Sequence, residues 1–199
     1  TTIPIGGTST FVVRFDPSAL GTRLATIHVI SDDNSEADYD FAVKGLGVEP
    51  EVAVLGVNLA LIADGDLSPW ALDGTDFGSI RKYLAVSNQT FTVTNSGTTV
   101  LNVSGIITNG SHPGDFIIIT PPSNQVAIGA TTTFTVQFDP SALGLRTAVL
   151  HLVNDDADEE DYDFAVQGAG IEPEISVRGT NLAEIADGDV TPSAIDGTD

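Results

Sequence analysis

The sequence repeats itself at an offset of 123 residues, and this repeat limits what the chain can fold into. Residues 1–76 align with residues 124–199 without a gap, and about 46 of the 76 aligned pairs are identical. The segment 64–76 (DGDLSPWALDGTD) returns as 187–199 (DGDVTPSAIDGTD), with every Asp and Gly in place. Self-similarity at a fixed period is the signature of a tandem array of one structural unit. The chain therefore holds one full unit and most of a second.

Glycines and a proline mark the boundaries between units. Residues 45–51 (GLGVEPE) lead from one unit into the next, and residues 168–174 (GAGIEPE) repeat them. Pro50 has no amide donor, so a sheet ladder cannot continue through it. A single proline in so short a joint predicts a stiff connection. We expect three parts: the C-terminal part of one repeat in 1–48, a complete repeat in 49–170, and the N-terminal part of the next in 171–199.

Each unit has the pattern of β-structure. Short runs rich in Val, Ile, Phe and Tyr alternate apolar with polar residues, which is typical of half-buried strands. Turn residues such as Asn95-Ser96-Gly97 separate these runs. Seven or eight short strands and no helix predict an all-β sandwich. The runs are 11–15, 25–30 and 39–43 in the first part, then 52–55, 77–80, 91–94, 100–106 and 116–119, with three more in 131–170.

The charge and composition exclude several classes of partner. A net charge of −21 and a pI near 4.1 argue against binding to nucleic acid or to anionic membrane. They favour the binding of cations, or a strongly hydrated surface in an environment of high salt concentration. The absence of Cys excludes disulfides and thiolate metal sites. No run of about 18 apolar residues is present, so no membrane-spanning segment is expected. A chain without Met and rich in Thr, Ser, Asp and Gly is typical of a secreted microbial surface protein.

Further motifs lie in the complete repeat. They are residues 73–78 (DGTDFG), 91–98 (FTVTNSGT), 115–116 (DF), 129–140 (GATTTFTVQFDP) and 154–168. Together they resemble the bacterial choice-of-anchor D repeats, which are similar to the ASH/MSP/Hydin group of immunoglobulin-like domains. The resemblance covers 49–170 and both partial units. It implies tandem immunoglobulin-like β-sandwich repeats of 123 residues in a large secreted protein, with no catalytic residues.

Four aspartates of the first Asp-Gly loop are candidate metal ligands. Asp64, Asp66, Asp73 and Asp76 lie near the boundary between units, and their glycine neighbours allow sharp turns. Ca²⁺ requires several converging oxygen ligands, which such a loop could supply. The spacing is not that of an EF-hand, and the alternative is a turn in which each Asp accepts hydrogen bonds from nearby amides. The second copy offers Asp187, Asp189, Asp196 and Asp199.

A second acidic stretch forms the predicted hairpin tips at 32–38 and 155–161. Between these copies Asn34 becomes Ala157, and Asp158 and Glu160 are new. The two stretches therefore keep a high density of negative charge, while the positions of some of their acidic residues differ. A coordination cage needs fixed ligand positions, whereas a solvated turn needs only charge. We therefore expect solvated turns here rather than metal sites.

No catalytic pattern is visible. His28 and His151 fall on the polar side of a predicted strand, and His112 precedes Pro113 in a loop. None of these histidines belongs to a nucleophile motif. The many Asp pairs leave open a catalytic carboxylate pair of the glycosidase type, but we expect no enzyme.

The leading hypothesis is a structural repeat module in an extracellular fibre, stalk or adhesin at the cell surface. Its expected partners are copies of itself: neighbouring repeats, or chains that complete partial repeats and polymerise into a filament. Ca²⁺ is the expected cofactor candidate, stiffening the array at the acidic loops. The alternative is a ligand- or carbohydrate-binding adhesin domain, which requires a concave pocket with aromatic groups. Only three Tyr and one Trp are available for such a pocket.

Overall fold

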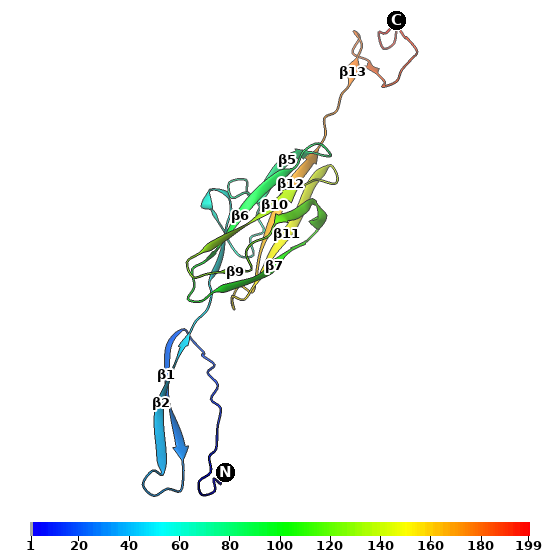
Figure 1. Cartoon of the computed structure of the whole chain (residues 1–199). Helices are drawn as coiled ribbons and strands as arrows, with labels where there is room; N and C mark the ends of the chain where they lie inside the picture. The colour runs from blue at the N-terminus through cyan, green and yellow to red at the C-terminus, as the bar shows by residue number, and fades with distance from the viewer. Residues whose placement is uncertain (1) are drawn as a thin grey trace.

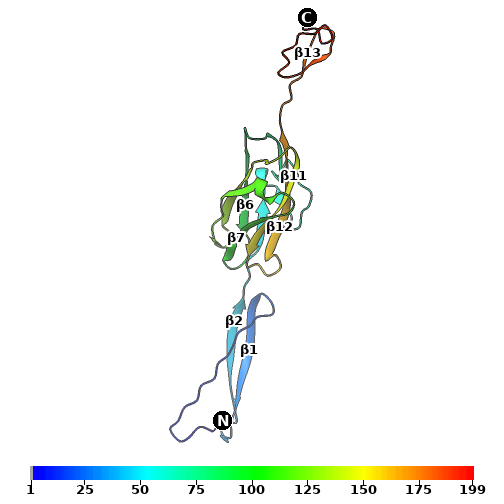
Figure 2. The ribbon, with the colours of Figure 1, turned by 90° about the vertical axis from the view of Figure 1, so that its right-hand side faces the viewer.

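A computed structural model describes residues 2–199, and the described chain contains β-strands and two three-residue 3-10 turns but no α-helix. The all-β prediction is therefore confirmed. A central domain of residues 49–171 lies between an N-terminal hairpin and a short C-terminal segment (Figures 1 and 2). In the described residues no helix has the length and apolarity needed to cross a bilayer.

The central domain consists of two five-stranded sheets packed face to face. One has the order β4-β3-β6-β10-β8 and the other β5-β12-β11-β7-β9. All pairings are antiparallel except that of β5 with β12. The strands are β3 (Val52–Leu55), β4 (Leu61–Ile62), β5 (Asp76–Arg81), β6 (Ser87–Asn95), β7 (Leu101–Asn109), β8 (Phe116–Thr120), β9 (Gln125–Val126), β10 (Thr131–Phe138), β11 (Gly144–Asn154) and β12 (Asp161–Ile171), with turns η1 (Val57–Leu59) and η2 (Pro113–Asp115).

The sandwich has more strands than the seven or eight expected. The two strands that the sequence pattern did not reveal, β4 and β9, have two residues each. Two residues are too few for an alternating pattern to show. Both strands pair at a sheet edge, with β3 and β7 respectively.

Phenylalanine side chains from both sheets fill the core. Along β12, buried residues alternate with more exposed ones, so one face of the strand points inward. Phe164 of β12 lies with its ring centroid 5.5 Å from that of Phe91 in β6 of the opposite sheet. Phe91 in turn stacks on Phe134 at 5.2 Å, and Phe116 stacks on Phe138 at 4.8 Å. Full burial of each such ring contributes about 2–3 kcal/mol to the stability of the sandwich.

The N-terminal hairpin reproduces the hairpin of the central domain. It consists of β1 (Gly21–Ile30) and β2 (Asp38–Gly47). Its register, from Gly21↔Gly47 to Ile30↔Asp38, equals that of β11 with β12 after a shift of 123 residues. A Cβ on Gly45 would lie 2.4 Å from the Phe15 ring, and a Cβ on Gly168 would lie 2.4 Å from the Phe138 ring. Only glycine allows this aromatic contact in either copy.

The C-terminal segment repeats a smaller pairing. Its strands β13 (Val177–Arg178) and β14 (Glu184–Ile185) pair Val177 with Ile185. After the same shift this is the pairing of Val54 with Ile62 between β3 and β4.

One predicted strand is wrong in the first part of the chain. Residues 11–15 form no strand, although their counterparts 134–138 lie in β10. In the central domain β10 pairs with β6 on one side and β8 on the other. The described residues before β1 include no counterparts of β6 and β8. An alternating pattern is therefore not sufficient to form a strand, because the segment also needs neighbouring strands to pair with.

Asn95 joins three segments from a buried position. Its Nδ2 donates to the carbonyls of Thr99 (2.8 Å) and Val126 (2.9 Å), and its Oδ1 accepts from the amides of Gly97 (3.0 Å) and Glu51 (3.3 Å). The side chain is only 1% exposed. It thereby ties the end of β6 to the start of the domain and to β9.

Asn95→Ala is expected to lower the free energy of unfolding by about 2–4 kcal/mol, because several backbone groups lose their hydrogen-bond partners. Urea denaturation followed by circular dichroism measures the change. The matched control is Asn88→Ala, since Asn88 is an exposed amide in the same strand that bonds only to the Gln137 side chain. Equal losses in the two variants would contradict the role given to Asn95.

Candidate metal centre

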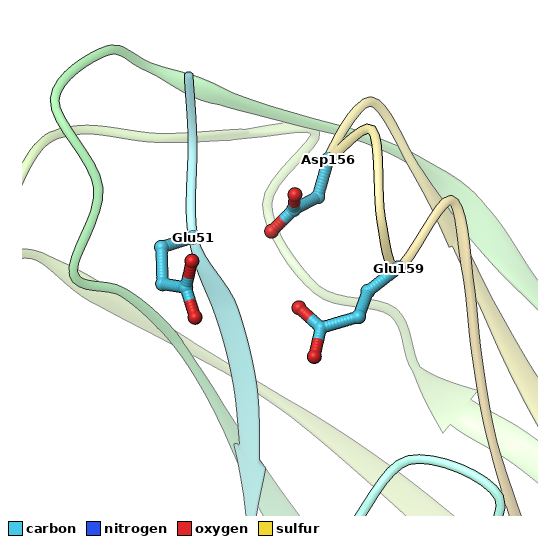
Figure 3. Close-up of side chains that lie close together, drawn as sticks. All are labelled: Glu51, Asp156 and Glu159. Carbon is cyan, nitrogen blue, oxygen red and sulfur yellow. The ribbon is translucent and has the colours of Figure 1, made fainter. Parts of the chain in front are cut away.

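Three carboxylates converge where the chain enters the central domain. Glu51, Asp156 and Glu159 form the carboxylate cluster, whose ligand atoms lie within 4.8 Å of one another (Figure 3). Within residues 2–199 it is the one group of three or more acidic or histidine side chains this close together. Glu51 directly precedes β3, and the other two come from the turn between β11 and β12.

Two carboxylate oxygens of the cluster are buried without a hydrogen-bond partner. Asp156 is 0% exposed, and its Oδ2 accepts the amide of Val52 at 2.8 Å. Its Oδ1 has no partner, and neither has Oε2 of the half-buried Glu159. Buried oxygens of this kind cost free energy unless a partner satisfies them. Glu51 is exposed, so solvent reaches the cluster from its side.

A single buried side chain shapes the turn that carries two of the acids. Asn154 accepts the amide of Asp156 at 2.8 Å through Oδ1, and its Nδ2 donates to the carbonyl of Glu159 at 2.6 Å. In the N-terminal hairpin Ser31 takes this place: its hydroxyl accepts the amide of Asp33 at 3.2 Å and donates to the carbonyl of Glu36 at 3.0 Å. The turn thus keeps its backbone form in both copies.

The electrostatics of the cluster are those of unneutralised acids. Loss of hydration raises the pKa of the buried Asp156 and the half-buried Glu159, and the partial desolvation of the exposed Glu51 raises its pKa too. Repulsion adds to this: Asp156 and Asp158 raise the pKa of Glu51, and Asp156 and Glu51 raise that of Glu159. For Asp156 the amide of Val52 lowers the pKa against this rise, and Asp158 acts in both directions: its carboxyl raises the pKa of Asp156 and its amide lowers it.

Among residues 2–199, no Lys or Arg offsets the charge of the carboxylate cluster by an ion pair. Across the described residues the ion pairs are Arg14–Asp16, Arg146–Asp115, His28–Asp38 and His151–Asp161.

The structure does not bring the four aspartates of the first Asp-Gly loop into one group. Asp64 accepts the amide of Asp163 at 2.8 Å, and Asp66 accepts that of Ser68 at 2.8 Å. Asp73 accepts from the amide (2.9 Å) and hydroxyl (2.6 Å) of Thr75. Asp76 accepts from the Gly78 amide and the Gln167 side chain, each at 2.8 Å. The bonds from Ser68, Thr75 and Gly78 are those of the alternative, a turn in which the carboxylates accept nearby amides. Asp64 and the second oxygen of Asp76 instead bond to β12.

The second Asp-Gly loop behaves in the same way. Asp189 accepts the amide of Thr191 at 2.8 Å, and Asp196 accepts that of Thr198 at 3.0 Å. Asp187 and Asp199 join no close group of acids in the described residues either. Calcium binding by these loops stays a prediction.

The prediction of a solvated tip at 155–161 is wrong for two of its acids, since Asp156 is buried and Glu159 half-buried. A signal was present in the sequence. Asp33 and Glu36 keep their identity as Asp156 and Glu159 at the 123-residue offset, while Asn34 and Ser35 between them change. Glu51 likewise returns as Glu174. The burial itself needs β3, which is remote in sequence and gives no local pattern.

Residues 71–169 match the family described as HYDIN/CFA65/VesB-like, Ig-like domain. Within the central domain, these residues form a HYDIN/CFA65/VesB-like Ig-like domain. This confirms the Hydin-like, immunoglobulin-like part of the resemblance noted in the sequence. The carboxylate cluster lies on this Ig-like domain, with Asp156 and Glu159 inside the matched residues and Glu51 before them.

Solved structures similar to this chain come from bacteria and from man. A Porphyromonas gingivalis W83 protein of unknown function shares 13% identity, with 79% of this chain and 69% of that chain covered and a TM-score of 0.43. The ASH/PapD-like domain 7 of human CEP192 shares 17% identity, with 48% of this chain and 82% of that chain covered and a TM-score of 0.36. Vibrio cholerae VesB protease shares 14% identity, with 71% of this chain and 41% of that chain covered and a TM-score of 0.40. With TM-scores below 0.5, these likenesses carry no functional conclusion. No curated protein sequence matches the chain.

Proposed function

We propose that this chain is a structural module, one stretch of an extended array of Ig-like domains of the choice-of-anchor D type. In this proposal each domain is a passive spacer in an extracellular fibre, stalk or adhesin of a microbial surface, and its partners are further copies of itself. The observation that carries the proposal is the shared register of β1–β2 and β11–β12 at an offset of 123 residues. Two segments with the same sequence pattern and the same pairing are best explained as parts of two equivalent domains.

The exposed apolar face of the N-terminal hairpin supports this proposal. Phe15, Ile27 and Val43 line an open groove there. Their counterparts Phe138, Leu150 and Val166 belong to the buried core of the central domain. The groove therefore has the apolar composition of one inner face of a sandwich, which in the central domain is covered by the second sheet. This composition favours the array over the carbohydrate-binding alternative.

The junction at residues 48–51 supports a stiff connection. On one side of Pro50, the Glu49 carbonyl accepts the amide of Thr98 at 2.8 Å. On the other side, the Glu51 carbonyl accepts the amide of Ser96 at 2.9 Å. Since both neighbours of Pro50 are bonded to the turn after β6, the entering chain has little freedom to swing.

The histidines support a role without catalysis. His28 pairs with Asp38 and His151 with Asp161, each at 3.0 Å and at equivalent positions of the two hairpins. His112 accepts the amide of Thr147 at 3.1 Å through Nδ1. Each imidazole thus has a structural partner on a strand or turn.

Extending the chain by complete 123-residue periods tests the array. Small-angle X-ray scattering is expected to show a maximum dimension that grows by a constant increment with each added period. Replacing residues 49–51 by glycines at every junction is the control, and it should broaden the distribution of distances. Chains that stay compact as periods are added would refute the spacer role, and saturable binding of the same chains to a glycan array would favour the adhesin alternative.

A further inference from the structure

We infer that the carboxylate cluster of Glu51, Asp156 and Glu159 binds one hard divalent cation of the size of Ca²⁺. This assigns a ligand to the domain that the spacer role does not require, and it places the ion outside the Asp-Gly loops. The inference holds for a single domain and does not rest on the array.

The separation of the oxygens allows one ion to contact all three carboxylates, and the open, three-carboxylate coordination favours calcium. Ca²⁺ binds carboxylate oxygens at about 2.3–2.6 Å, so two oxygens on opposite sides of the ion are about 4.6–5.2 Å apart. The ligand atoms of the cluster lie within 4.8 Å of one another. Mg²⁺ requires oxygens at about 2.0–2.1 Å in octahedral geometry and keeps most of its water. Three carboxylates on two separate segments, with one side open to solvent, match the flexible coordination of Ca²⁺.

The second observation is the orphaned oxygen of Asp156. The side chain is fully buried, one oxygen is held by the Val52 amide, and the other, Oδ1, has no partner. Asp156 is directed towards Glu51 and Glu159 (Figure 3). An acid with no role beyond a surface turn would face water. Asp33, the counterpart of Asp156 in the N-terminal hairpin, is such a residue: it is exposed, and its carboxylate accepts hydrogen bonds from Ser35. A cation would satisfy both orphaned oxygens and offset three converging negative charges.

The position of the cluster gives the ion a mechanical consequence. Glu51 follows Pro50 at the junction, and the other two ligands belong to the β11–β12 turn. Ala157, at the tip of that turn, borders a cleft shared with Glu49 and with residues 17–20 and 47–48 of the N-terminal part. An ion held by all three carboxylates would therefore fasten the entering chain to the end of the domain that faces the preceding segment.

Calorimetric titration of the full chain at pH 7, freed of metal, with CaCl₂ or MgCl₂ tests the site. One Ca²⁺ per chain is expected. At Ca²⁺ 100-fold above its Kd the melting temperature of the central domain should rise by about 5–10 °C, with a smaller rise for Mg²⁺. Absence of a Ca²⁺ heat and of any shift would overturn the inference, and an equal response to Mg²⁺ would overturn the assignment to calcium.

Amide variants locate the ion. Asp156→Asn and Glu159→Gln keep the side-chain shape but remove a charge, so each should weaken Ca²⁺ binding at least tenfold. Without calcium the same variants should melt at a higher temperature than the parent chain, because a repulsive charge is gone. This second readout shows that the variant folds and separates loss of a ligand from loss of structure.

Matched controls complete the test. Glu160→Gln changes an exposed acid of the same turn and should leave Ca²⁺ binding unchanged. The double variant Asp64→Asn with Asp66→Asn should also bind as the parent chain does. If this double variant lost the response while Asp156→Asn kept it, the ion would lie in the Asp-Gly loop and the inference would fail. A Ca²⁺ response equal in all variants would likewise refute it.

Discussion

Replacing Phe164 with alanine is expected to lower the free energy of unfolding of the central domain by about 3–5 kcal/mol. The ring is 1% exposed on β12 and packs across the sandwich on Phe91, with 5.5 Å between centroids. Alanine removes this contact between the two sheets and leaves a cavity. Urea denaturation, followed by circular dichroism and by the fluorescence of Trp70, measures the loss.

The chain carries its own control for this substitution. Phe41 occupies the equivalent position 123 residues earlier, on a hairpin of the same register, yet it is 39% exposed. Phe41→Ala is expected to change the stability of the central domain by less than about 0.5 kcal/mol. Similar losses for the two variants would show that the N-terminal hairpin and the central domain unfold as one unit, contrary to the fold described above.

Arg146→Met is expected to destabilise the central domain by about 3–5 kcal/mol at neutral pH. The Arg146 side chain is 14% exposed and its Nε donates to Oδ2 of Asp115, which is 5% exposed. Methionine replaces the aliphatic part of arginine but leaves the carboxylate of Asp115 buried without its counter-charge. Arg23→Met is the control, because Arg23 is the counterpart of Arg146 and makes no ion pair with an acid in the described residues. Equal effects of the two would contradict a role for the ion pair.

The effect of Arg146→Met should depend on pH. Burial raises the pKa of Asp115, but hydrogen bonds from Arg146 and Ser141 and the charge of Arg146 outweigh burial, so the net pKa is lowered. A carboxyl whose pKa is lower in the folded than in the unfolded state stabilises the fold above its unfolded value of about 3.9. That stabilisation is lost as the pH falls through the folded value.

Melting temperatures of the parent chain and of Arg146→Met, measured from neutral pH down to about pH 3, check this. The gap between them should narrow below about pH 5. The gap is the proper measure because the acids of the carboxylate cluster have raised pKa values and change the stability of both proteins alike. A gap that stayed constant over this range would show that Asp115 and Arg146 are not coupled.

The sequence by itself determined those strands and turns that depend on interactions between residues close together in the chain. Alternation placed β1, β2, β11 and β12, because side chains on a strand point to opposite faces with a period of two. The turn that the sequence left as an alternative for the first Asp-Gly loop is also local: the carboxylate of Asp73 accepts the Thr75 amide. The 123-residue offset likewise gave the shared register of the two hairpins.

Tertiary structure decided whatever depends on a distant partner. The run 11–15 has the pattern of its counterpart in β10 but forms no strand, since a ladder needs neighbours to accept its hydrogen bonds. Phe41 and Phe164 have the same local sequence and opposite exposure, because burial requires an opposing sheet. Asp156 became a candidate ligand only when β3, whose Val52 amide lies 104 residues away in sequence, came to lie against the β11–β12 turn. Spacing along the chain records which residues recur, whereas burial and charge convergence are properties of segments brought together by folding.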